Sequence, residues 1–167
     1  MKIGIAQIDC EPGNVDVNLE KIAQFVKKAQ ETKCRLVLFP EMVDTGYEMS
    51  FIKNKASAWD EKPYKCLENL AKEYGIYLAA GISEKKENKI FNTLAVISDS
   101  GKLVGKYRKT HLADYSPLNE GRVISPGDEL AMVEIVDIKF GLMICYDLRF
   151  PEMSRRLALE GADVLLL

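Results

Sequence analysis

The sequence has no strong excess of either charge and no long apolar run. Its 23 Lys and Arg residues nearly balance its 25 Asp and Glu residues, so the basic excess typical of nucleic-acid-binding proteins is missing. No apolar run reaches the roughly 18 residues of a membrane-spanning helix. The first residues lack the apolar core and cleavage site of a signal peptide. These absences predict a cytoplasmic protein that binds neither nucleic acid nor membrane.

Cysteine and histidine are also scarce. The four cysteines (Cys10, Cys34, Cys66 and Cys145) include no CxxC pair, which argues against a zinc-ligand set. They are too few for a disulfide scaffold in a chain of 167 residues. We therefore expect four reduced thiols, of which at most one or two have a chemical role.

The patterns that are present predict a single α/β domain over residues 1–167. Residues 17–31 carry apolar residues at the spacing of an amphipathic helix, and residues 63–74 begin at Pro63 and are followed by Gly75, as a helix often is. The short apolar run 35–39 indicates a buried strand. The expected strands cover 2–8, 35–39, 76–83, 90–98, 102–108, 131–136, 138–145 and 162–167, and the expected helices cover 17–31, 63–74 and 151–160. Residues 109–130 are expected to form a long loop, a kind of segment that is often functional.

The final segment, 162–167, is an apolar strand that is not followed by a turn. An interior strand normally continues into a turn. We therefore expect the chain to be a fragment that lacks its C-terminal portion, and the alternative is a protein that ends in a strand.

Glu41 is the first candidate for chemistry. It follows the apolar run 35–39 after Pro40, and catalytic groups in α/β sheets gather beyond the carboxyl ends of strands. The alternative is a solvated loop carboxylate.

The second candidate segment is Lys106–Leu112, a run of basic residues that opens the long loop. Such a run is usually a solvated face, but a lysine turned inward would stabilise the oxyanion of a tetrahedral intermediate. His111 is the single histidine. It is either the base of a Cys–His dyad or a structural histidine beside a strand end.

The third candidate is Cys145, at the end of an expected strand and before a helix. This strand–turn–helix order is that of a nucleophile elbow, in which the Tyr146 N–H would be an oxyanion donor. The nearby helix start would favour the thiolate. The alternative is a buried structural cysteine, which is our interpretation of the other three.

Together, these segments resemble the carbon–nitrogen hydrolase (nitrilase) superfamily over the whole chain. The motifs that carry the resemblance are IGIAQID, LVLFPEM, GKYRKTHL and GLMICYDLRFPE. The resemblance implies that Cys145 is the nucleophile, Glu41 the general base and acid, and Lys109 the stabiliser of the tetrahedral intermediate. It further implies that Glu120 is a supporting glutamate and that His111 is only a structural neighbour of the lysine.

The resemblance implies a fold and an activity as well. The fold is a four-layer α-β-β-α sandwich, here incomplete at its C-terminus, so that 1–167 would be the N-terminal part of the domain if the chain is a fragment. The activity is hydrolysis of the C–N bond of a small amide through a cysteine thioester, by a homo-oligomer that needs no metal or organic cofactor.

The sequences of these motifs are most similar to those of small omega-amidase-like members, which act on amides that carry a carboxylate. Arg149 is a candidate partner for that carboxylate, with a structural ion pair as its alternative, and Tyr47 is a second candidate substrate-binding residue. Nitrile and N-carbamoyl substrates remain open, and so does a non-catalytic scaffold or binding subunit.

Overall fold

A computed structural model describes residues 1–167. The strands are β1 (Ile3–Ile5), β2 (Leu36–Leu38), β3 (Tyr77–Lys86), β4 (Lys89–Ile97), β5 (Leu103–Arg108), β6 (Met132–Ile135), β7 (Ile138–Leu142) and β8 (Val164–Leu166). The helices are α1 (Val15–Glu31), α2 (Met49–Lys55), α3 (Lys62–Tyr74) and α4 (Pro151–Leu159), with short 3-10 helices η1 (Glu120–Arg122) and η2 (Cys145–Arg149). None of the helices is long and apolar enough to span a membrane.

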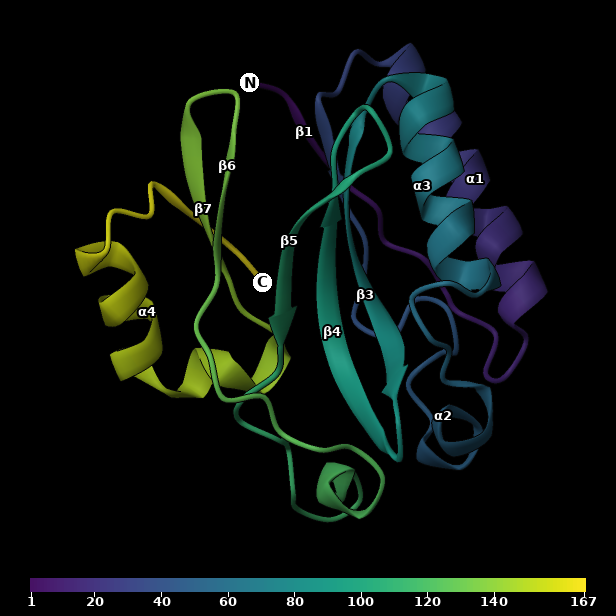
Figure 1. The fold of residues 1–167 in the computed structure, drawn as a ribbon, viewed down its shortest axis with the longest axis vertical. Coiled ribbons are helices and arrows are strands. Elements are labelled where there is room, and N and C mark those ends of the chain that lie inside the picture. Colours follow the sequence, from purple (N-terminus) through teal and green to yellow (C-terminus); the bar gives the residue numbers. More distant parts are fainter.

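Two sheets lie face to face between two layers of helix (Figure 1). The first sheet has the order β1-β2-β3-β4-β5, parallel from β1 to β3 and antiparallel from β3 to β5. The second has the order β6-β7-β8, with β6 antiparallel and β8 parallel to β7. Helices α1 and α3 cover the outer face of the first sheet, and α4 covers that of the second. This is the α-β-β-α arrangement that the resemblance implies.

The two sheets share an apolar core. Leu36, Leu94 and Tyr107 of the first sheet pack in one cluster with Val133 and Phe140 of the second. Burial of these side chains fixes the sheets against each other, because interiors are close-packed. The segments that follow β2, β5 and β7 are thereby held at one end of the sandwich.

Most of the expected elements are present, with ends shifted by a few residues, but two expectations were wrong. Helix α2 was not predicted, because Ile52 is its one buried residue and it has no periodic apolar face. The strand expected over 138–145 ends at Leu142. Cys145 instead begins η2, so the elbow is reached three residues after the strand has ended.

Candidate active site

Glu41 lies in a tight turn that packs against β3. The backbone turns sharply after it, and Met42 has a φ of 52°, a conformation that non-glycine residues rarely adopt. Gly81 allows the close approach, because a Cβ at that position would lie 2.5 Å from the Cα of Glu41. The Val43 N–H donates to the Gly81 carbonyl oxygen at 2.8 Å, which anchors the turn on the sheet.

Lys109 lies immediately after β5 with its side chain fully buried. Its Nζ lies 2.9 Å from Oε1 of Glu41 and 2.9 Å from Oε1 of Glu120. Burial disfavours the charged ammonium, but the two carboxylates outweigh this cost and raise the pKa of Lys109. The lysine is therefore a fixed cation at neutral pH.

Glu120 accepts hydrogen bonds on both of its oxygens. Oε1 accepts from the Tyr47 hydroxyl at 2.7 Å as well as from Lys109, and Oε2 accepts from the Ala113 N–H. Burial and Glu120 raise the pKa of Tyr47, which keeps the phenol protonated as a donor. Since Glu120 is fully buried and its oxygens are occupied, it is placed to hold Lys109 rather than to exchange protons.

Cys145 is the one exposed cysteine. Its φ is 46°, and strained backbone of this kind clusters at functional sites. Tyr146 follows it in the first turn of η2, where backbone N–H groups have no partner within the helix. The elbow expected from the sequence is therefore present, built on a 3-10 turn.

The electrostatic environment of Cys145 differs from the expectation that a helix start favours the thiolate. Desolvation raises the pKa of the Cys145 thiol to about 11, the Glu41 carboxylate adds to the rise, and Lys109 opposes it. Helix η2 has five residues, too short for a substantial macrodipole. The thiol is thus protonated at neutral pH.

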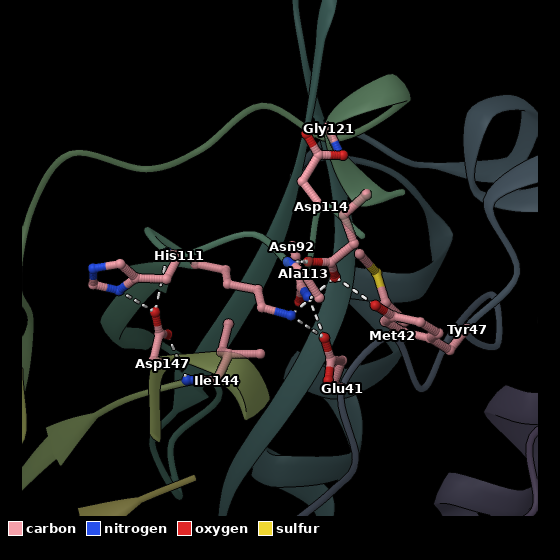
Figure 2. Close-up of polar contacts among 12 residues, drawn as sticks. Glu41, Met42, Tyr47, Asn92, His111, Ala113, Asp114, Gly121, Ile144 and Asp147 are labelled. Atoms are coloured by element: carbon pink, nitrogen blue, oxygen red, sulfur yellow. Dashed lines mark hydrogen bonds and ion pairs between the residues drawn. The ribbon is translucent and has the colours of Figure 1, made fainter. Parts of the chain in front are cut away.

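Asp147 ties the elbow to the segment that carries Lys109. Its buried carboxylate accepts from the Ile144 N–H at 2.9 Å, the Tyr107 hydroxyl at 2.8 Å and the His111 N–H at 3.1 Å. Figure 2 shows Asp147 between His111 and Ile144. This one side chain therefore fixes the end of β5 relative to the turn after β7. Asp147 is not among the residues predicted from the sequence.

His111 does not form a dyad with the cysteine. Its Nδ1 lies 2.9 Å from Oδ1 of Asp147, and its ring stacks on Phe150 with centroids 3.8 Å apart. The position is that of a structural neighbour of the lysine segment, as the resemblance implies.

A cavity of about 220 Å³ opens beside Glu41 and Cys145. Seven of its ten lining residues are hydrophobic. Tyr47 also lines a neighbouring cavity of about 410 Å³. No group of three or more His, Cys, Asp or Glu side chains is arranged to hold a metal ion.

Arg149 lies at the exposed end of η2. It takes part in none of the ion pairs of the structure, so the structural ion pair offered as its alternative role is not formed. Its part in binding a substrate carboxylate stays a prediction.

Comparison with known proteins gives consistent matches. The family model described as carbon–nitrogen hydrolase matches residues 2–167. A probable nitrilase of Schizosaccharomyces pombe is 36% identical, over 99% of this chain and 62% of its own length. A 2-oxoglutaramate amidase of Bacillus subtilis is 31% identical, over 98% of this chain and 62% of its own length. The chain thus spans less than two thirds of these relatives.

Solved structures agree with the sequence matches. The crystal structure of an amidase from Nesterenkonia sp. superposes with a TM-score of 0.89 at 27% identity, over 99% of this chain and 63% of that one. In a variant of the amidase from Nesterenkonia sp. AN1, acrylamide has undergone Michael addition at the active-site cysteine.

Proposed function

Since this chain belongs to the carbon–nitrogen hydrolase family, we propose that it carries the catalytic residues of a cysteine-dependent amidase. One observation carries the proposal: the buried ammonium of Lys109 lies 2.9 Å from the carboxylate of Glu41, and Glu41 and Cys145 line the same cavity. The amidase names of relatives in Bacillus subtilis and Xenopus laevis support it.

In the first half-reaction, Glu41 takes the thiol proton as Sγ of Cys145 attacks the amide carbon. A base is needed because the thiol pKa is about 11. The carbonyl electron pair moves to oxygen, where Lys109 and the Tyr146 N–H stabilise the negative charge. Loss of one such donor typically lowers turnover by about 10²–10³-fold.

Collapse of the tetrahedral intermediate breaks the C–N bond. Glu41 returns its proton to the departing nitrogen, ammonia or an amine leaves, and the acyl group stays on Cys145 as a thioester. Water then attacks the thioester carbon while Glu41 accepts its proton. The carboxylic acid leaves and the proton returns to Sγ. Acid–base assistance of this kind contributes roughly 10²–10⁴-fold.

The substrate class that we propose is a small amide, which the omega-amidases among the relatives support. Nitrile hydrolysis is the second candidate, because a nitrilase of Pyrococcus abyssi is 33% identical. The same thiol would add to the nitrile carbon. We further propose a homo-oligomer in the cytoplasm.

Ammonia release from a panel of small amides, nitriles and N-carbamoyl compounds tests this function. We expect release from amides by the native protein, none above background by Cys145→Ala, and unchanged release by Cys34→Ala. Turnover that persists in Cys145→Ala would contradict the proposal. Ammonia from nitriles alone would establish the second candidate, and no release from any compound would favour a non-catalytic role.

A further inference from the structure

Asn92 lies inside β4 and contacts Glu41 through its side chain and Lys109 through its backbone. Its side chain is fully buried, and its Nδ2 donates to Oε1 of Glu41 at 2.6 Å. The backbone carbonyl oxygen of Asn92 accepts a hydrogen bond from the backbone N–H of Lys109 at 2.9 Å. Figure 2 shows its amide beside the Glu41 carboxylate. Asn92 is thus in contact with both residues.

The hydrogen bonds of Glu41 all fall on one of its two oxygens. Oε1 accepts from Asn92 at 2.6 Å and from Lys109 at 2.9 Å, whereas no side-chain or backbone donor of the chain bonds to Oε2. The Glu41 side chain is 18% exposed, at the edge of the cavity that it shares with Cys145. One oxygen is therefore occupied and the other is free to exchange a proton.

The side-chain amide of Asn92 has an unpaired acceptor. Oδ1 of Asn92 is buried and accepts no hydrogen bond. Turning the amide over would place Oδ1 against Oε1 of Glu41, which is also an acceptor, so the carboxylate dictates the orientation. An unpaired buried acceptor is destabilising and rare in native cores. The hydrogen bond from Nδ2 to Glu41 is therefore what explains a polar side chain at this buried position.

We propose that Asn92 is a positioning residue, which together with Lys109 holds Oε1 of Glu41 so that Oε2 exchanges the proton with Cys145. The inference rests on the proposed function, in which Glu41 is the base. Asn92 touches none of the reacting atoms and acts through the carboxylate. Without it, Glu41 has one fixed contact in place of two and can rotate away from the thiol.

Thr93 provides a matched control in the same strand. It is also fully buried, and its hydroxyl donates to Oε2 of Glu84 at 2.7 Å, a carboxylate outside the site. Thr93→Val removes one buried hydrogen bond to a carboxylate, as Asn92→Ala does, but leaves Glu41 untouched.

The test is a double-mutant cycle of Asn92→Ala and Glu41→Gln, read by the pH dependence of Cys145 alkylation with iodoacetamide. Glu41→Gln lowers the pH midpoint because an anion beside the thiol is lost. Asn92→Ala shifts the midpoint part of the way in the same direction, and it adds no further shift in the Glu41→Gln background. On an amide that the native protein hydrolyses, Asn92→Ala lowers kcat about 10-fold to 100-fold with KM within about twofold.

Equal shifts of the midpoint by Asn92→Ala in both backgrounds would overturn the proposal, and so would an equal effect of Thr93→Val. Asn92→Leu, which keeps the volume, replaces Asn92→Ala if the latter fails to fold. Because alkylation needs no turnover, the cycle tests the coupling between Asn92 and Glu41 even if no amide is hydrolysed. A lack of amide hydrolysis would count against the proposed function but not against the coupling.

Discussion

Gly81 in β3 packs so closely on Glu41 that no side chain fits between them. A Cβ on Gly81 would lie 2.5 Å from the Cα of Glu41 and 2.7 Å from the carbonyl oxygen of Pro40. Both are backbone atoms, which cannot rotate away as a flexible side chain can. The position of the proposed base is therefore set by a glycine on the neighbouring strand.

Gly81→Ala should displace the Glu41 turn. We expect the free energy of unfolding in urea to fall by about 1–3 kcal/mol, as for other overpacked sites. Amide turnover should fall about 100-fold, because misplacement by about 1 Å is enough for such a loss.

Gly75→Ala is the control for backbone strain without a clash. Gly75 has a φ of 59° and no atom within 4 Å of an added Cβ. We expect a loss of about 1–2 kcal/mol in stability with unchanged turnover. Native turnover in Gly81→Ala would contradict our account of the Glu41 turn.

Glu41→Gln should separate thiol reactivity from catalysis. The Glu41 carboxylate helps to raise the pKa of the Cys145 thiol to about 11, so its neutralisation lowers that pKa and increases the thiolate fraction at pH 7. Iodoacetamide should then label Cys145 faster than in the native protein, although amide turnover is lost. Labelling of Cys34 in the same sample is the internal control. Slower labelling of Cys145 would mean that Glu41 does not act on the thiol as an anion.

Glu120→Gln should destabilise the fold by leaving Lys109 with one carboxylate. Because Lys109 and Glu120 are both fully buried, we expect unfolding in urea to show a loss of about 3–5 kcal/mol. Tyr47→Phe removes one hydrogen bond to Glu120 and keeps the ion pair. It should cost only about 1–2 kcal/mol. Equal losses in the two variants would show that the charge of Glu120 does not stabilise Lys109.

Buried Asp44 should make stability depend on pH. Desolvation raises its pKa to about 6, although hydrogen bonds from Ser83 oppose the rise, whereas in the unfolded chain we expect about 3.9. The folded state therefore binds more protons between these values. The stability that protonated Asp44 contributes to the folded state is complete below about pH 4 and is lost as the pH rises through 6.

Urea unfolding of the native protein and Asp44→Asn at pH 4, 5, 6 and 7 measures this effect, since the difference between them cancels the contributions of other groups. Two pH units correspond to about 3 kcal/mol. The native protein should lose this stability relative to the variant between pH 4 and pH 6. A constant difference would show that Asp44 does not titrate there.

The sequence predicts the parts of this molecule whose causes are local. Helices α1 and α3 have apolar residues at helical spacing and clear ends, such as Gly75 in the left-handed conformation. Helix α2 has neither, and its position depends on packing against later segments. The order of four layers comes from the resemblance, because the residue pattern alone does not say which faces of two sheets meet.

In the candidate site, too, the local features could be predicted from the sequence and the tertiary contacts could not. The motifs indicate Glu41, Lys109 and Cys145, but not the contacts that orient them. Asp147 lies inside a motif, yet its role depends on partners near His111, 36 residues away in the chain. Asn92 had a detectable signature: together with Thr93, it is one of two polar side chains in the otherwise apolar strand segment 91–97. That pattern predicts a buried polar residue, and only the tertiary structure shows that its partner is the proposed base.

The most direct test of the account is to look for the acyl group on Cys145 during turnover. The protein is mixed with an amide that it hydrolyses, the reaction is stopped with acid, and peptide masses are measured. We expect the peptide containing Cys145 to gain the mass of the acyl group, and both this adduct and ammonia release to be absent in Cys145→Ala. Ammonia release that continues while Cys145 stays unmodified would contradict it.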